Sequence, residues 1–294
     1  MTTTLERAAA TAPSSVAGRR PIRVGRTVAN VIAVIWAVVW VFPIYWMVSN
    51  ALRPTTAIGS GPDLLPTPFT VSNFHRVLSS SDFWAALRMS STIALLTVVV
   101  ALVTAFFAAI AISRFRFRGR KGVIIAVVVI QMIPAEALFV SQYKMLDAWS
   151  LLNSAIGMTL LYAGANIPFT VWMLKGFVDN VPQELEQAAM IDGCSRFSAF
   201  IRISLPLLWP GLVAAGIFSF LAAWNEFTLA LVILTNREDQ TLPLWLGTFQ
   251  PKLQGTDWGG MMAGSTVMAL PVVILFAFVQ KRIAEGMVGG AVKG

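Results

Sequence analysis

The stretch Ser91–Ile112, STIALLTVVVALVTAFFAAIAI, contains no charged residue over 22 positions. An α-helix rises about 1.5 Å per residue, so a helix of this length crosses the roughly 30 Å hydrocarbon core of a bilayer. One residue later, the basic run RFRFRGRK occupies positions 114–121. Lysine and arginine gather on the cytoplasmic side of membrane-spanning helices. Together the two features predict a transmembrane helix whose C-terminal end lies in the cytoplasm.

The composition of the whole chain extends this prediction. Of its 294 residues, 56% are hydrophobic and only 12% are charged, whereas a soluble domain carries roughly 25% charged residues. So few charges exclude a soluble enzyme, a disordered chain and a disulfide scaffold. The chain holds one cysteine, Cys194, and one histidine, His75. This excludes an intramolecular disulfide and a cysteine–histidine metal cluster, so we expect no metal site.

Five further stretches are apolar and long enough to span a membrane. The six predicted spans are Thr27–Ser49, Ser91–Ile112, Val123–Met145, Ala155–Leu174, Leu208–Leu234 and Met261–Gln280. Short connections join them, which predicts an all-α integral membrane protein with six transmembrane helices in one domain, residues 27–283. The first stretch is too long for the apolar part of a signal peptide and has no small-residue cleavage site after it.

The lysines and arginines indicate the orientation of these spans. Sixteen of the 22 lie in the N-terminal tail (1–26), the second and fourth connections, and the C-terminal tail (from 284 to 294, with the residues just before it). By the positive-inside rule both tails are cytoplasmic. The first 18 residues, rich in Ala, Ser and Thr, are predicted to be disordered. We interpret the basic runs as topology signals and lipid-headgroup contacts, not as a nucleic-acid site.

The connection between the fourth and fifth spans, Asn180–Pro206, is called the elbow below; its sequence is NVPQELEQAAMIDGCSRFSAFIRISLP. Pro182 is suited to the first position of a helix, where an N–H is not needed. Glu184 and Glu186 then fall in the first turn, where the helix dipole favours negative charge. We predict a helix that runs through Ile191.

A second short helix follows in the elbow. Gly193 is suited to the left-handed conformation that ends the first helix, Ser195 can cap the second, and Pro206 is expected to stop it before the next span. Small residues and apolar ones share this segment: Ala188, Ala189, Met190, Ile191, Phe197 and Phe200. This surface suits either a docked protein or an amphipathic linker in the headgroup region.

One motif in the elbow resembles a known family. Gln187-Ala188-Ala189, three residues, Gly193, nine residues and Ile203-Ser204-Leu205-Pro206 are similar to the EAA signature of ABC importer permeases. The surroundings resemble the carbohydrate-uptake, maltose-type branch. The resemblance extends over nearly the whole chain after residue 27, and includes SNALRP (49–54), WNEF (224–227) and GAVKG (290–294).

This resemblance implies a role for the elbow. In the family, the corresponding loop, here 179–206, contains a coupling helix that sits in a groove of a cytoplasmic ATPase subunit. The implied coupling residues are Glu186, Gln187, Ala188, Ala189, Asp192, Gly193, Ile203, Leu205 and Pro206. The leading acidic position of the signature is Gln187 here. Whether Glu186 replaces it stays open, because adjacent helical side chains point about 100° apart.

The resemblance also implies an assembly. The chain has no Gly-Lys dipeptide and so no P-loop, which places ATP and Mg in partner subunits, and no cofactor in this chain. Expected partners are a second homologous permease, two cytoplasmic ATPases, an extracytoplasmic solute-binding protein, membrane lipid and a sugar substrate, in a bacterial cytoplasmic membrane. The alternatives are a permease for another solute, such as a glycerophosphodiester, a secondary transporter, and a membrane-embedded enzyme, for which a catalytic set is missing.

Polar residues inside the predicted spans form a second candidate site, since such residues are costly in lipid. They are Gln131, Glu136, Asn166, Trp224, Asn225 and Glu226. Glu136 and Glu226 lie at similar depth, roughly 12–14 Å from the outer ends of their spans, which suggests one polar cavity. These residues either contact sugar hydroxyls, with Trp224 stacked on a sugar face, or form interhelical hydrogen bonds. Pro134 is expected to kink the third span.

Overall fold

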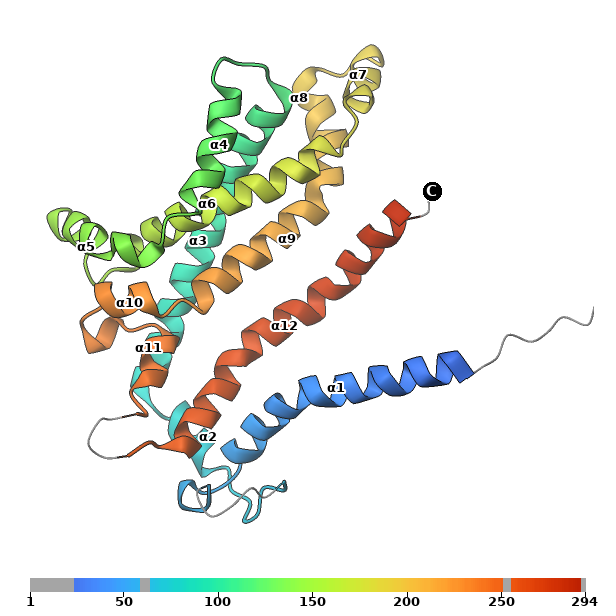
Figure 1. Cartoon of the computed structure of the whole chain (residues 1–294). Coiled ribbons are helices and arrows are strands. Elements are labelled where there is room, and N and C mark those ends of the chain that lie inside the picture. Colours follow the sequence, from blue (N-terminus) through green and yellow to red (C-terminus); the bar gives the residue numbers. More distant parts are fainter. Residues whose placement is uncertain (1–23, 59–63, 251–254, 292–294) are drawn as a thin grey trace, which may run out of the picture. The chain divides into compact units, whose positions relative to one another are not determined.

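The computed structural model describes residues 24–58, 64–250 and 255–291, which are helical and contain no strand (Figure 1). The helices and helical turns are α1 Val24–Ala51, η1 Thr55–Ala57, α2 Ser72–Leu78, α3 Ser81–Arg114, α4 Arg120–Ile130, η2 Ala135–Leu138, α5 Phe139–Ala148, α6 Ala155–Asp179, α7 Gln183–Ile191, α8 Arg196–Ala199, η3 Phe200–Ser204, α9 Leu205–Trp224, α10 Thr228–Ile233, η4 Arg237–Asp239, α11 Leu242–Gly247 and α12 Trp258–Ala291. The chain divides into two compact units, residues 1–46 and 47–294.

The first unit consists of the N-terminal part of α1. Its side chains from 26 to 45 are all exposed and predominantly apolar. A helix that is apolar all round and exposed is suited to a lipid environment, in agreement with the first predicted span. The predicted N-terminal tail lies outside the described residues, except for its last three, which already belong to α1.

Three long helices form the centre of the second unit. α3 packs most extensively against α6 and next against α9. Its inward face carries fully buried alanines, among them Ala94, Ala101, Ala105 and Ala109. Small side chains on one helix face let neighbouring backbones approach closely, which is how apolar helices associate inside lipid. The long apolar stretch that opened the sequence is therefore the central element of the fold.

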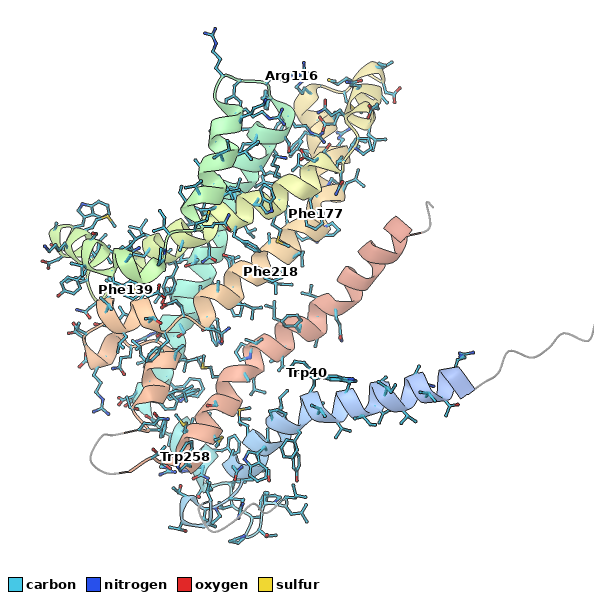
Figure 2. All side chains as sticks on the ribbon, in the orientation of Figure 1. Trp40, Arg116, Phe139, Phe177, Phe218 and Trp258 are labelled. Carbon is cyan, nitrogen blue, oxygen red and sulfur yellow. The ribbon has the colours of Figure 1, made fainter. Side chains whose placement is uncertain are left out.

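α6 and α9 also approach each other closely, at Gly211 on α9. A Cβ atom added at Gly211 would lie 2.4 Å from the ring of Phe177 on α6 (Figure 2). That distance is shorter than any normal contact, so the ring fits only because position 211 has no side chain. The crossing of these two helices depends on this glycine.

We expect Gly211→Ala to destabilise the second unit by about 1–3 kcal/mol, the usual cost of overpacking a core. Gly176→Ala is the matched control, because a Cβ there meets no atom within 4 Å. The midpoint of thermal unfolding in detergent measures the difference. Equal midpoints for the two variants would contradict the close packing of Phe177 on Gly211.

The third predicted span, Val123–Met145, is not one helix. α4 ends at Ile130, and α5 begins at Phe139 after the 3₁₀ turn η2; the two halves are bent by 96°. Pro134 lies in the break, where it lacks the N–H that a continuous helix needs. The predicted kink at Pro134 is confirmed, and it is a sharp break between two helices.

The fifth predicted span, Leu208–Leu234, has different ends in the structure. The helical segment runs from Arg196 to Trp224 and stops there; residues 225–227 are not helical, and α10 follows. The prediction that Pro206 stops the second elbow helix is wrong. Pro206 occupies the second position of α9, where a missing N–H is tolerated, and the π-helical turn η3 joins α8 to α9 without a break.

By length and apolar composition, four helices in the described part of the chain could cross a membrane, or five if the bent α4–α5 pair counts as one span. α6 has 25 residues, which is long enough, but no 18-residue stretch of it is as apolar as the best stretches of those four. The count of six spans therefore stays a prediction. α12 continues to Ala291, so the predicted C-terminal tail is helical up to that residue; 292–294 lie outside the described part.

The second unit has two chemically different ends, one at each end of α3. At the N-terminal end of α3, Arg237 pairs with Asp82 at 3.0 Å, and the N–H of Leu242 donates to Ser90 Oγ at 2.8 Å, which brings η4 and α11 to this end. α2 also contacts α3 and α12 (Figure 1). The elbow lies at the C-terminal end of α3.

Candidate functional site

The elbow consists of two helices around a glycine, as predicted. α7 spans Gln183–Ile191, and Pro182 precedes it with an extended backbone, one position earlier than expected. Gly193 has a φ of +92°, the left-handed conformation that its missing side chain permits. Ser195 Oγ accepts a hydrogen bond from the N–H of Ser198 at 3.2 Å and so caps α8. The local geometry of the elbow is confirmed.

Glu186 faces the interior of this end of the molecule. Its carboxylate lies 3.4 Å from the guanidinium of Arg114, the last residue of α3. Ser204 Oγ donates to the same carboxylate at 2.5 Å, and Arg114 also donates to the carbonyl of Val181 at 2.9 Å. Glu186 is thus bonded within this chain, whereas the adjacent Gln187 is exposed.

The outer face of the elbow combines small and apolar residues. Gln187, Ala188 and Asp192 are exposed there. Ile191 and Phe197 are 87% and 75% exposed, values that are unusual for large apolar side chains at a water-facing surface. The remaining predicted coupling residues divide by burial: Ala189 is buried, Ile203 and Leu205 are half-buried, and Pro206 is exposed.

A pocket of about 500 Å³ opens between the elbow and the end of α3. The ion pair between Arg114 and Glu186 forms part of its wall, together with Gln187. The rest of the lining is predominantly apolar and includes Phe107, Ile110, Phe115, Met190, Phe197 and Phe200. The elbow therefore touches α3 through a polar contact beside an apolar hollow.

A second polar cluster joins α3 to α6 at the same end. Asp179 accepts hydrogen bonds from Lys175, at 2.5 Å, and from Ser113. Burial opposes ionisation of Asp179, but the bonds from Lys175 and Ser113 outweigh it and lower the pKa of the carboxyl group. Asp179 lies beyond the predicted fourth span and stays charged at neutral pH, which fixes the α6 end against α3.

The end of the molecule that carries the elbow is also strongly basic. The connection between α3 and α4 contains Arg116 and Arg118, and α4 begins with Arg120 and Lys121; all four are exposed or half-buried. Arg116, which follows the C-terminal end of α3, lies at this end of the bundle (Figure 2). The positive charges and the elbow therefore share one end of the bundle, which is what the positive-inside rule requires of a cytoplasmic elbow.

Glu226 lies in the break between α9 and α10, and its contacts are internal. Its carboxylate accepts hydrogen bonds from Tyr162 Oη at 2.5 Å and from the N–H groups of Leu229 and Ala230 at 2.7 and 3.1 Å. The group thus satisfies the first turn of α10 and ties it to α6. Of the two roles predicted for Glu226, sugar contact and interhelical hydrogen bond, this arrangement favours the interhelical hydrogen bond.

Trp224 is buried as well, at 2% exposed. Its ring stacks on Phe220 with centroids 5.3 Å apart, and its Nε1 donates to the carbonyl of Met268. A buried and stacked ring has no free face for a sugar in this conformation, so the predicted stacking role does not fit. Asn225 is exposed and bonds only locally, to the Leu221 carbonyl.

The other polar residues of the spans lie elsewhere. Asn166 is half-buried on α6, where its side chain donates to the carbonyl of Tyr162. Gln131 and Glu136 are exposed in the break between α4 and α5, and Gln131 bonds to the carbonyl of Val127. A cavity that holds Glu136 and Glu226 together stays a prediction.

Sequence reasoning missed the partners of the two glutamates. Arg114 and Tyr162 lie 72 and 64 positions from Glu186 and Glu226, and Ser204 lies 18 positions from Glu186. One signal was present for Arg114: it is the first basic residue after the long apolar stretch, so the positive-inside rule predicts that it stands at the membrane surface beside a cytoplasmic connection.

Comparison with known proteins gives one consistent result. Residues 101–289 match the family described as binding-protein-dependent transport system inner membrane component. The chain is 42% identical to the diacetylchitobiose uptake system permease protein DasC of Streptomyces coelicolor, over 92% of this chain and 98% of that protein. It is 33% identical to the trehalose transport system permease protein SugB of Mycobacterium tuberculosis, over 86% and 92% of the two chains.

A solved structure shares the fold. The crystal structure of a bacterial ABC transporter that imports the acidic polysaccharide alginate contains a chain that superposes with a TM-score of 0.75, over 89% of this chain and 97% of that one, at 22% identity. The family match covers more than half of the chain, and the relatives match it almost end to end. The chain therefore belongs to the binding-protein-dependent transport system inner membrane components, the permeases of ABC importers.

Proposed function

We propose that this permease carries a sugar or small oligosaccharide across the cytoplasmic membrane, delivered by an extracytoplasmic binding protein and driven by ATP in separate subunits. The observation that carries the proposal is the outer face of the elbow. Ile191 and Phe197 stand out there beside exposed Ala188, a combination that rewards a close protein contact. Family membership favours a docking role for the elbow over an amphipathic linker. It also favours an ABC importer over a secondary transporter for the whole chain.

The proposed assembly follows from the two ends of the molecule. The basic end with the elbow lies in the cytoplasm and binds an ATPase subunit; a second, homologous permease binds the other ATPase. The binding protein approaches the opposite end, near α2 and α11. A sugar is the proposed substrate because both named relatives are sugar permeases. Both chain termini are cytoplasmic in this arrangement, since the basic connections share that side.

Reconstitution tests the proposed function. We expect vesicles that contain both permeases and both ATPases to accumulate a disaccharide only with ATP inside and the binding protein outside. The substrate panel includes diacetylchitobiose, trehalose and a glycerophosphodiester. Uptake that does not require ATP contradicts an ABC mechanism, and uptake of the glycerophosphodiester alone contradicts the sugar assignment.

Intact cells test the orientation. A membrane-impermeant thiol reagent added outside should label Gly255→Cys and leave Gly119→Cys unlabelled. The two glycines are comparable probes because both have positive φ and open space around the Cβ position. Labelling of Gly119→Cys from outside would reverse the proposed orientation.

A further inference from the structure

We propose that Arg114, Glu186 and Ser204 form a latch that fixes the elbow to α3 and α9 and transmits its movement to them. The proposal rests on the function proposed for the elbow and assigns how its motion reaches the bundle. The latch is a positioning device: none of its three side chains is required to touch the ATPase or the sugar.

The first half of the latch lies on α3. The Arg114 guanidinium makes two contacts with different parts of the elbow: it pairs with Glu186 on α7 and donates to the carbonyl of Val181 in the connection from α6. One side chain thus holds both the entry to the elbow and its first helix. A planar guanidinium with several donors is suited to such divided bonding.

The second half lies at the exit of the elbow. Ser204 is fully buried at the end of η3, directly before α9. Its hydroxyl donates to the same Glu186 oxygen, Oε1, that faces Arg114. This oxygen therefore joins the C-terminal end of α3, the first elbow helix and the start of α9.

The burial of the pair gives the latch its strength. The side chains of Arg114 and Glu186 are only 12% and 18% exposed. Salt screens such a partly buried pair less than a pair at the surface, and removal of one partner leaves the other charge poorly solvated. α3 continues from Arg114 through its buried alanines into the contacts with α6 and α9, so a force at the elbow acts on the packed centre of the bundle.

The latch also separates the roles of two adjacent residues. Gln187 is exposed at the rim of the pocket, whereas Glu186 is half-buried and bonded within the chain. On this proposal Gln187 is the side chain available to an ATPase, and the neighbouring acid acts within the chain.

The test uses the complete transporter with Glu186→Ala. The ATPase should still co-purify, because the outer face is unchanged, while the sugar transported per ATP hydrolysed should fall about fivefold or more, within the usual range of coupling between sites. Ser204→Ala should lower the same ratio by a smaller factor, since it removes one hydrogen bond and leaves the charges in place. Glu184→Ala is the matched control: it removes an exposed charge from the same helix.

A charge exchange distinguishes a latch from a general structural role. Arg114→Glu combined with Glu186→Arg restores opposite charges at the same places, so its transport per ATP should exceed that of either single variant. A double variant no better than the worse single variant overturns the proposal. The proposal is also overturned if the Glu186→Ala and Ser204→Ala transporters move as much sugar per ATP hydrolysed as the Glu184→Ala transporter.

Loss of the ATPase from purified Glu186→Ala transporter would also overturn the latch, because it would make Glu186 a docking contact. That result would leave the proposed function intact. Failure of the proposed function would give a different result. The ATPase would still bind when the outer face of the elbow is blocked.

Discussion

Gly193→Trp is expected to abolish ATP-driven uptake in a chain that still inserts into the membrane. Gly193 has a φ of +92°, and a Cβ there meets no atom within 4 Å. The indole would therefore project into open space on the elbow, where it holds an ATPase surface away from Ala188. The left-handed backbone adds a strain of about 1–2 kcal/mol for any residue with a Cβ.

Gly119→Trp separates docking from strain. Gly119 has a nearly identical φ of +90° and the same open surroundings, but it lies in the connection between α3 and α4. This variant should retain ATPase binding and uptake. The measurements are co-purification of the ATPase with the permease and transport in reconstituted vesicles. Full co-purification and normal transport with Gly193→Trp would leave the elbow as a linker only.

Glu226→Ala is expected to lower the stability of the permease by about 3 kcal/mol or more, because each buried donor left without its acceptor costs about 1–3 kcal/mol. The variant loses the bond from Tyr162 and both bonds from the first turn of α10. The yield of assembled complex and its unfolding midpoint in detergent should both fall, and uptake should fall with them.

Asn225→Ala is the control for that experiment. Asn225 is adjacent, exposed and bonded only to the carbonyl four residues before it, so its removal should leave the complex stable. A stable Glu226→Ala complex that has lost uptake would contradict the structural role and place the carboxylate on the sugar pathway.

Features that depend on local chemistry could be predicted from the sequence. Membrane insertion follows from the length and composition of apolar stretches such as Ser91–Ile112, because the free energy of transfer into lipid is summed over adjacent residues. The left-handed turn at Gly193 and the cap at Ser195 follow from the backbone preferences of single residues. The same short-range rules located the break at Pro134, although not its angle.

Features that depend on distant partners appeared only in the tertiary structure. Glu186 and Gln187 are adjacent acceptors on one helix, and only the position of Arg114 at the end of α3 decides which of them turns inward. Glu226 could equally have faced a cavity; Tyr162 on α6 and the first turn of α10 hold it inside.

The fifth predicted span ends early, at Trp224, for a related reason. The Glu226 carboxylate accepts hydrogen bonds from N–H groups that a continuous helix would have bonded to its own backbone. Composition and local preference determine where helices form in this protein, whereas the packing of α3, α6 and α9 determines which of their polar side chains meet, because those contacts join residues that are far apart in the chain.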